Sequence, residues 1–216
     1  MEIVPTAEDE RFAREVYERF RAKPGSARIA SAFALAHLAA LLRERRPRSA
    51  LEIGAGIGTV TWALLAHPVG VERVVATEDV PFCLEQLDRN LTQEMKNRLH
   101  LVTEPRTFAS VQGPFDLLII DGVWDWEAVA ARLREGSACF VEGQRKRERA
   151  DLREALRRRN LDCVFVPYRR GFRIQFSWEW PTSGGVLRVR PRIRLSRRPL
   201  KGCWIGEVRR IQSAQP

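Results

Sequence analysis

The stretch ALEIGAGIGTVT, residues 50–61, places Gly54, Gly56 and Gly58 between an apolar run and a segment of helical character. Residues 50–53 are predicted to form a buried strand and residues 60–66 a helix. A tight turn of glycines between a strand and a helix lets backbone amides approach a ligand closely, because no side chain stands in the way. The chain is therefore expected to contain a strand, turn and helix unit of the α/β class.

The alternation of strands and helices continues along most of the chain. Strands are predicted over residues 73–77, 99–102, 115–120, 138–141, 163–166 and 172–178, and helices over residues 81–91, 126–133 and 145–159. Two further helices, over residues 7–22 and 26–46, come before them. Apolar strands that alternate with helices favour a doubly wound, mostly parallel sheet with helices on both faces.

The chain divides into three predicted parts. Residues 1–48 form an N-terminal helical cover, residues 49–181 form the sheet domain, and residues 182–216 form a basic C-terminal extension. Pro181 and the run of Ser183, Gly184 and Gly185 mark the second boundary. Beyond it, residues 186–195 and 203–211 have the pattern of a β-hairpin.

The composition indicates a cytoplasmic protein with no membrane partner. The longest apolar stretch, residues 29–42, contains His37 and is too short to span a bilayer. The N-terminus is acidic and lacks the basic and then apolar order of a secretory signal. The four cysteines are scattered without a CxxC pair, which favours reduced and mostly buried thiols.

The net charge of +10 lies mainly in the C-terminal half. In the run RVRPRIRL, alternation places four arginines on one face of a strand: Arg188, Arg190, Arg192 and Arg194. Such a row could follow the phosphates of an RNA, because guanidinium groups bind phosphate oxygens in pairs. The alternative is an edge strand that Pro191 and the charges protect from pairing with another molecule.

Acidic residues at two positions limit the class of ligand that the glycine turn can bind. Glu52 stands two residues before Gly54, where a carboxylate suits a ligand with an ammonium group and would repel a pyrophosphate. About twenty residues further on, Glu78 follows the next predicted strand, where an acidic residue commonly accepts hydrogen bonds from ribose hydroxyls. The alternative is that the glycines only allow a helix and a strand to pack closely.

Three motifs in order, LEIGAGIG, VVATED and FDLLIIDG, resemble those of the class I S-adenosylmethionine-dependent methyltransferases, in the style of the small-molecule O-methyltransferases. The resemblance covers roughly residues 49–178 and implies a Rossmann-like, seven-stranded sheet with S-adenosylmethionine as cofactor. It implies that Glu52 and the backbone of Gly54 and Gly56 contact the methionine part, that Gly58 belongs to the same cofactor site, and that Glu78 holds the ribose. Adenine would lie near the end of the third strand, where Thr103 or Glu104 is a candidate.

The acceptor is expected in the crevice beyond the carboxyl ends of the strands. Asp121, directly after the predicted strand 115–120, borders the cofactor there and is the candidate catalytic residue, as base, orienting group or metal ligand. A helix cap or another structural role is the alternative for Asp121. Trp124 and Glu142 are candidate substrate-binding residues, and so is His37, which could reach the crevice from the second helix or simply pack in the core.

A metal site is not predicted. Some of the O-methyltransferases that the chain resembles hold a divalent metal with an Asp at the place of Asp121 and an Asp-Asn pair after the fifth strand. Glu142 and Gly143 stand at that second place, so one hard oxygen ligand is missing and the remaining carboxylates would make a poor Mg²⁺ site. A divalent metal stays an alternative.

The sequence thus predicts an S-adenosylmethionine-dependent methyltransferase that acts on a hydroxyl or another nucleophile of a small molecule. Methylation of RNA through the arginine strand is the first alternative. Aminopropyl transfer is a second, although a basic C-terminal half argues against a polyamine substrate. A non-catalytic binding module on the same fold is a third. The oligomeric state is open, because the hairpin could cover its own crevice or that of a second subunit in a homodimer.

Overall fold

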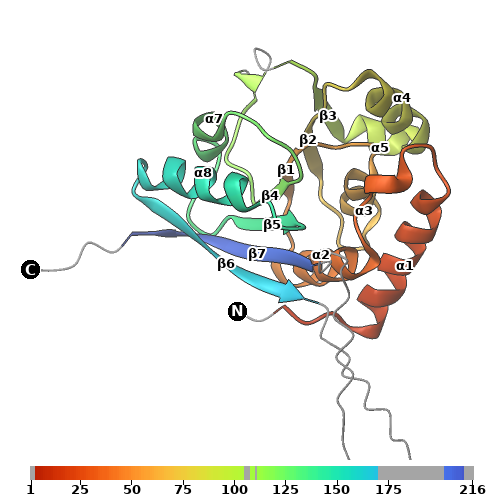
Figure 1. The fold of residues 1–216 in the computed structure, drawn as a ribbon, viewed down its shortest axis with the longest axis horizontal. Helices are drawn as coiled ribbons and strands as arrows, with labels where there is room; N and C mark the ends of the chain where they lie inside the picture. The colour runs from red at the N-terminus through yellow and green to blue at the C-terminus, as the bar shows by residue number, and fades with distance from the viewer. Residues whose placement is uncertain (1–2, 105–107, 110, 170–201, 212–216) are drawn as a thin grey trace, which may run out of the picture.

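The computed structural model describes residues 3–104, 108, 109, 111–169 and 202–211. Within these residues seven strands form one sheet: β1 (Ser49–Ile53), β2 (Arg73–Thr77), β3 (Leu99–Val102), β4 (Leu117–Ile120), β5 (Ala138–Glu142), β6 (Leu161–Arg169) and β7 (Gly202–Arg210). Their order across the sheet is β3-β2-β1-β4-β5-β7-β6 (Figure 1). The pairs among β1 to β5 are parallel, while β7 runs antiparallel to both β5 and β6. The predicted α/β class and mostly parallel, seven-stranded sheet are confirmed.

Helices cover both faces of this sheet. They are α1 (Ala7–Arg21), the 3-10 turn η1 (Ser26–Arg28), α2 (Ala32–Arg45), α3 (Thr59–Ala66), α4 (Pro81–Asn90), α5 (Gln93–Asn97), α7 (Trp126–Ala130) and α8 (Lys146–Arg157). Strand residues alternate between two buried clusters: Leu117 packs with α1, α2 and α3, whereas Leu118 packs with α7 and α8. Figure 1 shows these two groups of helices on opposite sides of the strands. The doubly wound arrangement follows from this alternation.

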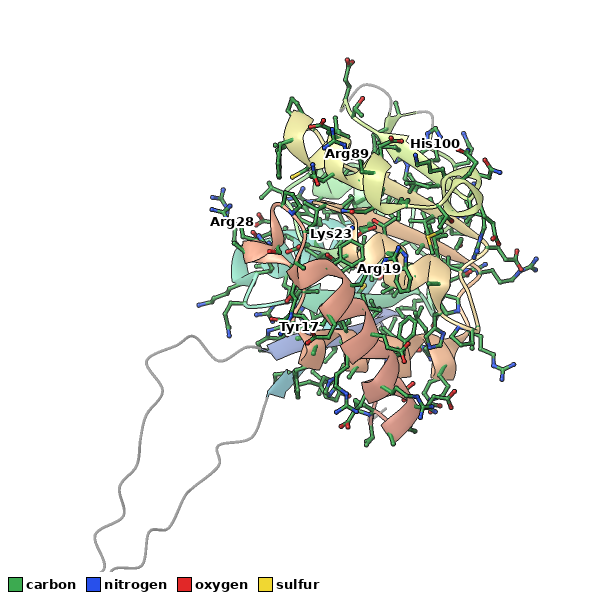
Figure 2. All side chains as sticks on the ribbon, turned by 90° about the vertical axis from the view of Figure 1, so that its right-hand side faces the viewer. Tyr17, Arg19, Lys23, Arg28, Arg89 and His100 are labelled. Atoms are coloured by element: carbon green, nitrogen blue, oxygen red, sulfur yellow. The ribbon has the colours of Figure 1, made fainter. Side chains whose placement is uncertain are left out.

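The helix α1 forms an amphipathic outer layer over α2. A capping box of Thr6 and Asp9 begins it, and Val16 and Phe20 are fully buried beneath it. Figure 2 labels Tyr17 and Arg19 on the same helix, where Arg19 is exposed and Tyr17 is half-buried against the core. The helix α2 is buried along most of its length, as the apolar sequence predicts. No helix in the described part of the chain is long and apolar enough to cross a membrane.

The sequence predicts one helix over residues 26–46, whereas the structure has two elements with a break between them. The backbone of Ile29 and Ser31 is extended, and the Ser31 hydroxyl accepts a hydrogen bond from the Ala34 amide, so α2 begins anew after Ser31. The short helix α5 is also absent from the sequence prediction, although Thr92 caps it in the same way. Both errors come from reading apolar periodicity without weighing a capping hydroxyl.

The predicted strand at residues 203–211 is confirmed as β7, which lies within the sheet. It hydrogen-bonds to β5 on one side and to β6 on the other, and Gly206 passes so close to Cys163 that an added Cβ would lie 2.6 Å from its sulfur. These nine residues therefore complete the core sheet. The strands predicted over residues 172–178 and 186–195 lie outside the described residues, so a boundary between residues 181 and 182 stays a prediction.

Candidate active site

A cavity of about 610 Å³ opens at the carboxyl ends of β1, β2 and β4. The turn after β1, the end of β2 and the loop after β4 form most of its wall. The segment of residues 25–30 around η1 and the side chain of Arg145 form the rest. The strand β1 lies between β2 and β4, so this is the place where the chain order reverses in the sheet. Open α/β sheets bind their ligands at such a point.

The glycine turn lies between the two strand ends. Gly54 has a φ of +87°, and its amide donates to the Thr77 hydroxyl at 3.1 Å. A Cβ on Gly54 would lie 3.0 Å from the Gly122 nitrogen, so only glycine fits there without moving backbone. Gly56, by contrast, has no atom within 4 Å of where its Cβ would be, and it lines the cavity. The turn is therefore packed on one side and bare toward the cavity.

Glu78 joins the glycine turn to the end of β2. Its Oε2 accepts a hydrogen bond from the Gly56 amide at 2.7 Å, and its Oε1 accepts from the amides of Asp79 and Val80 at 3.1 and 3.0 Å. Three backbone amides thus fix the carboxylate in the cavity wall. The sequence predicts both Glu78 and the turn as cofactor contacts, but it does not predict the bond between them.

Glu52 lines the same cavity with a carboxyl group that is almost fully buried. The side chain is 1% exposed and accepts a hydrogen bond from the Thr61 hydroxyl at 2.6 Å. Burial raises the pKa of Glu52 to about 8, and the nearby carboxylates of Asp121 and Glu78 act in the same direction. A positively charged ligand group beside Glu52 would lower this pKa again and draw off the proton.

Asp121 stands at the start of the loop after β4 and pairs with a residue that the sequence does not single out. Its amide donates to the Ile53 carbonyl at 2.9 Å, and its Oδ1 accepts a hydrogen bond from Nη2 of Arg145. Burial raises the pKa of Asp121, and the Arg145 guanidinium opposes that rise. Twenty-four residues separate the partners, so only their positions after neighbouring strands could have indicated the pair.

Among the predicted acceptor residues, Trp124 lines the cavity and packs edge-on against Phe108, with ring centroids 5.6 Å apart. Glu142 lies outside the cavity wall, where its Oε1 accepts a hydrogen bond from the Ser31 amide. His37 also lies outside it. The His37 ring packs against Phe33 and Tyr168, and its Nδ1 is 2.9 Å from the Phe33 carbonyl oxygen.

Two predicted cofactor residues do not line the cavity. Gly58, with a φ of +91°, begins α3 and faces Leu87, whose Cδ1 would lie 2.6 Å from an added Cβ. Glu104 comes just after β3 and is not part of the wall either. The structure therefore brings together Glu52, Gly54, Gly56, Glu78, Asp121 and Trp124.

Two other predictions concern metal and RNA. Within the described ranges no group of three or more His, Cys, Asp or Glu side chains is placed to hold a metal ion. The arginine strand, with Arg188, Arg190, Arg192 and Arg194, lies outside the described residues, so RNA binding through it stays untested.

The order of the strands, the antiparallel β7 and the helices on both faces define the fold of the class I methyltransferases. A methyltransferase from Podospora anserina with bound S-adenosylhomocysteine shares this fold at a TM-score of 0.56, with 14% identity over 97% of this chain and 99% of the other. An O-methyltransferase from Bacillus cereus in complex with S-adenosylhomocysteine gives 0.51, with 13% identity over 96% and 93% of the two chains. An O-methyltransferase of tomaymycin synthesis from Streptomyces achromogenes, in complex with S-adenosylmethionine, gives 0.50, with 16% identity over 96% and 92%. No protein-family model and no curated protein sequence matches the chain.

Proposed function

We propose that the protein is a methyltransferase that uses S-adenosylmethionine to methylate a hydroxyl group of a small molecule. The observation that carries this function is the bond between Glu78 and Gly56 in the wall of one cavity that also contains Glu52 and Asp121. The solved structures that share the fold with bound S-adenosylmethionine or S-adenosylhomocysteine support the choice of cofactor. Two of them are O-methyltransferases, which supports a hydroxyl acceptor.

The residues of the cavity fit this cofactor. Glu78 is fixed at the end of β2, and its Oε2, which accepts one amide, can accept a further hydrogen bond from a ribose hydroxyl. The bare side of Gly56 leaves room for the backbone to approach the ligand. The Thr59 hydroxyl, at the start of α3 in the cavity wall, is buried with no hydrogen-bond partner among the described residues. A polar group of the cofactor would satisfy it.

The bound cofactor supplies a methyl group on a positively charged sulfur. The protein's part is to align the acceptor oxygen behind that methyl group and to exclude water, since in-line alignment provides most of the rate. Asp121 is the carboxylate on the acceptor side, and its bond with Arg145 holds it in place to take the hydroxyl proton. A cytoplasmic location is part of the same proposal.

Binding calorimetry with S-adenosylhomocysteine tests the cofactor site. Glu78→Gln keeps the shape of the side chain but removes its charge and sets an NH₂ group against backbone amides, so we expect affinity to fall by roughly tenfold to a hundredfold. Glu72→Gln is the matched control, because Glu72 is an exposed carboxylate that pairs with Arg48 far from the cavity. Failure of the wild-type protein to bind would refute the proposed function.

A further inference from the structure

The cavity carries charged groups of both signs. Glu52, Glu78 and Asp79 line the side that lies over β1 and β2. Asp121, which follows β4, and Arg145, which follows β5, line the side across β1, and Arg28, in η1, is also part of the wall. A ligand with a cationic centre fits the acidic side, whereas the two guanidinium groups would suit an anion on the acceptor.

Arg145 is held in position from two directions. One edge of its guanidinium donates to Asp121, and its Nη1 lies 4.0 Å from a Glu148 oxygen. A guanidinium has five N–H donors in a planar fork, so these contacts leave donors for a ligand. The side chain of Arg145 is 36% exposed and that of Asp121 is 28% exposed, so both are reached from the cavity. Arg145 can therefore serve the carboxylate behind it and an anion in the cavity at once.

The backbone at Arg145 is strained, which also points to a ligand role. Its φ of +29° and ψ of +46° are unusual for a residue with a side chain, and Gly143 two residues earlier is left-handed as well. Such strain is unfavourable and collects at ligand sites. The strained turn brings the arginine to the cavity wall before α8 begins.

Arg28 contributes a second positive charge at the mouth. Its side chain is exposed and extends from η1 beyond the ribbon (Figure 2), and the described residues give it no acidic partner within ion-pair distance. The segment that carries Arg28 is attached to the end of β5 through the bond between Ser31 and Glu142. The two arginines thus stand on segments that meet at the same strand end.

We propose, on the basis of the methyltransferase function above, that the acceptor is an anion: a small molecule with a carboxylate or phosphate group that Arg145 binds and Arg28 attracts. Carboxylate and phosphate oxygens match the guanidinium fork in pairs, which fixes the orientation of the molecule as well as its place. In this arrangement Arg145 is a specificity residue that orients the acceptor beside Asp121.

Calorimetry on the protein saturated with S-adenosylhomocysteine tests this with three probes: benzoate, phenyl phosphate and the neutral benzamide. We expect at least one anion to bind about tenfold tighter than benzamide, and Arg145→Gln to abolish the difference. Arg145→Lys should keep part of it, because the charge remains while the fork is lost. Arg28→Gln should weaken anion binding by roughly threefold, as a rim charge does.

Arg147→Gln is the matched control, since Arg147 lies two residues after Arg145 in the first turn of α8 with a side chain that is 91% exposed. It should leave all three affinities unchanged. Equal binding of anions and benzamide, or no binding of either anion, overturns the proposal. So does a loss of more than about tenfold in S-adenosylhomocysteine affinity in Arg145→Gln, because the arginine would then serve the carboxylate of the cofactor. Failure of wild type to bind S-adenosylhomocysteine would instead refute the methyltransferase function itself.

Discussion

Glu142, the last residue of β5, accepts a hydrogen bond at 2.9 Å from the backbone amide of Ser31, which precedes α2. The bond connects residues 111 positions apart and attaches the segment of residues 25–31 to the sheet. That segment forms one wall of the cavity, so Glu142, which does not line the cavity itself, helps to hold the wall in position.

Loss of this bond should loosen the segment without unfolding the protein. Glu142→Ala leaves the Ser31 amide without its carboxylate partner, and we expect the free energy of unfolding to fall by about 1–3 kcal/mol. Glu142→Gln keeps an acceptor oxygen and should cost less. Urea unfolding measures the stability, and amide hydrogen exchange at Ser31 reports the loosening. Unchanged exchange in Glu142→Ala would contradict this role.

Two glycines of the turn should lose stability to different degrees when they are replaced by alanine. Gly54→Ala forces a Cβ against the backbone of Asp121 and Gly122, which cannot move aside as a side chain can. We expect a stability loss of about 2 kcal/mol or more, measured by urea unfolding. Gly56→Ala meets no atom and should cost only about 1 kcal/mol for its left-handed backbone.

Gly56 should matter more in a binding experiment than in a measurement of stability. The methyl group of Gly56→Ala projects toward the cavity, so this variant should bind S-adenosylhomocysteine more weakly than the wild-type protein does. Its small loss of stability would not by itself explain that weaker binding. Calorimetry checks the affinity. Normal affinity in Gly56→Ala would mean that the ligand does not approach the turn.

Glu52 should make the protein less stable as the pH rises. Its pKa is about 8 in the folded protein and 4.5 in a free side chain, so between these values the folded state holds a proton that the unfolded chain releases. The free energy of unfolding should therefore fall across this window and level off above it. Glu52→Gln removes the titration, so its stability relative to wild type should rise by on the order of a few kcal/mol between about pH 5 and about pH 8. Urea unfolding at both pH values measures the change, and a constant difference would disprove the protonated state.

Arg132 should contribute more to the free energy of unfolding than an ordinary surface arginine does. Its guanidinium donates to the carbonyls of Val111, Phe108 and Ala128 at 2.9, 2.9 and 2.7 Å, and it lies 4.6 Å from the centre of the Phe108 ring. Lysine cannot make these bonds together, so Arg132→Lys should lower the free energy of unfolding by about 1–2 kcal/mol.

Arg134→Lys supplies the comparison. Arg134 is 59% exposed and its one carboxylate partner is Asp116 among the ion pairs of the described residues, so its replacement should change stability by less than about 1 kcal/mol. Equal losses in the two variants would show that the Arg132 carbonyl contacts contribute little.

The sequence predicts those parts of the fold that depend on neighbouring residues. The strand β2 has the predicted bounds, and Gly54 and Gly56 of the glycine turn line one cavity with Glu78. Each of these follows from local periodicity or from a turn that only glycine can make. The position of β7 between β5 and β6 is different, because the choice of partner strand is made by tertiary packing rather than by any pattern within residues 202–210.

The site shows the same limit. Arg145 has no motif around it, and its importance comes from meeting Asp121 across two strand ends. Glu142 stands where an acceptor contact was expected, yet its carboxylate faces Ser31. His37 has the right chemistry for a base, but its neighbours Phe33 and Tyr168 place it in the packing between α2 and β6. A side chain's chemistry is visible in the sequence, whereas its direction is not.

The insertion of β7 has a consequence for how the chain is made. On the ribosome β5 emerges well before β7, and β6 has no sheet neighbour other than β7 among the described strands. The edge of β5 that later bonds to β7 therefore stays unpaired until about residue 210 has left the exit tunnel. During this time it can pair with a strand of another nascent chain. Translation pauses between the codons of β5 and those of β7 should therefore raise aggregation of this protein more than pauses before β5.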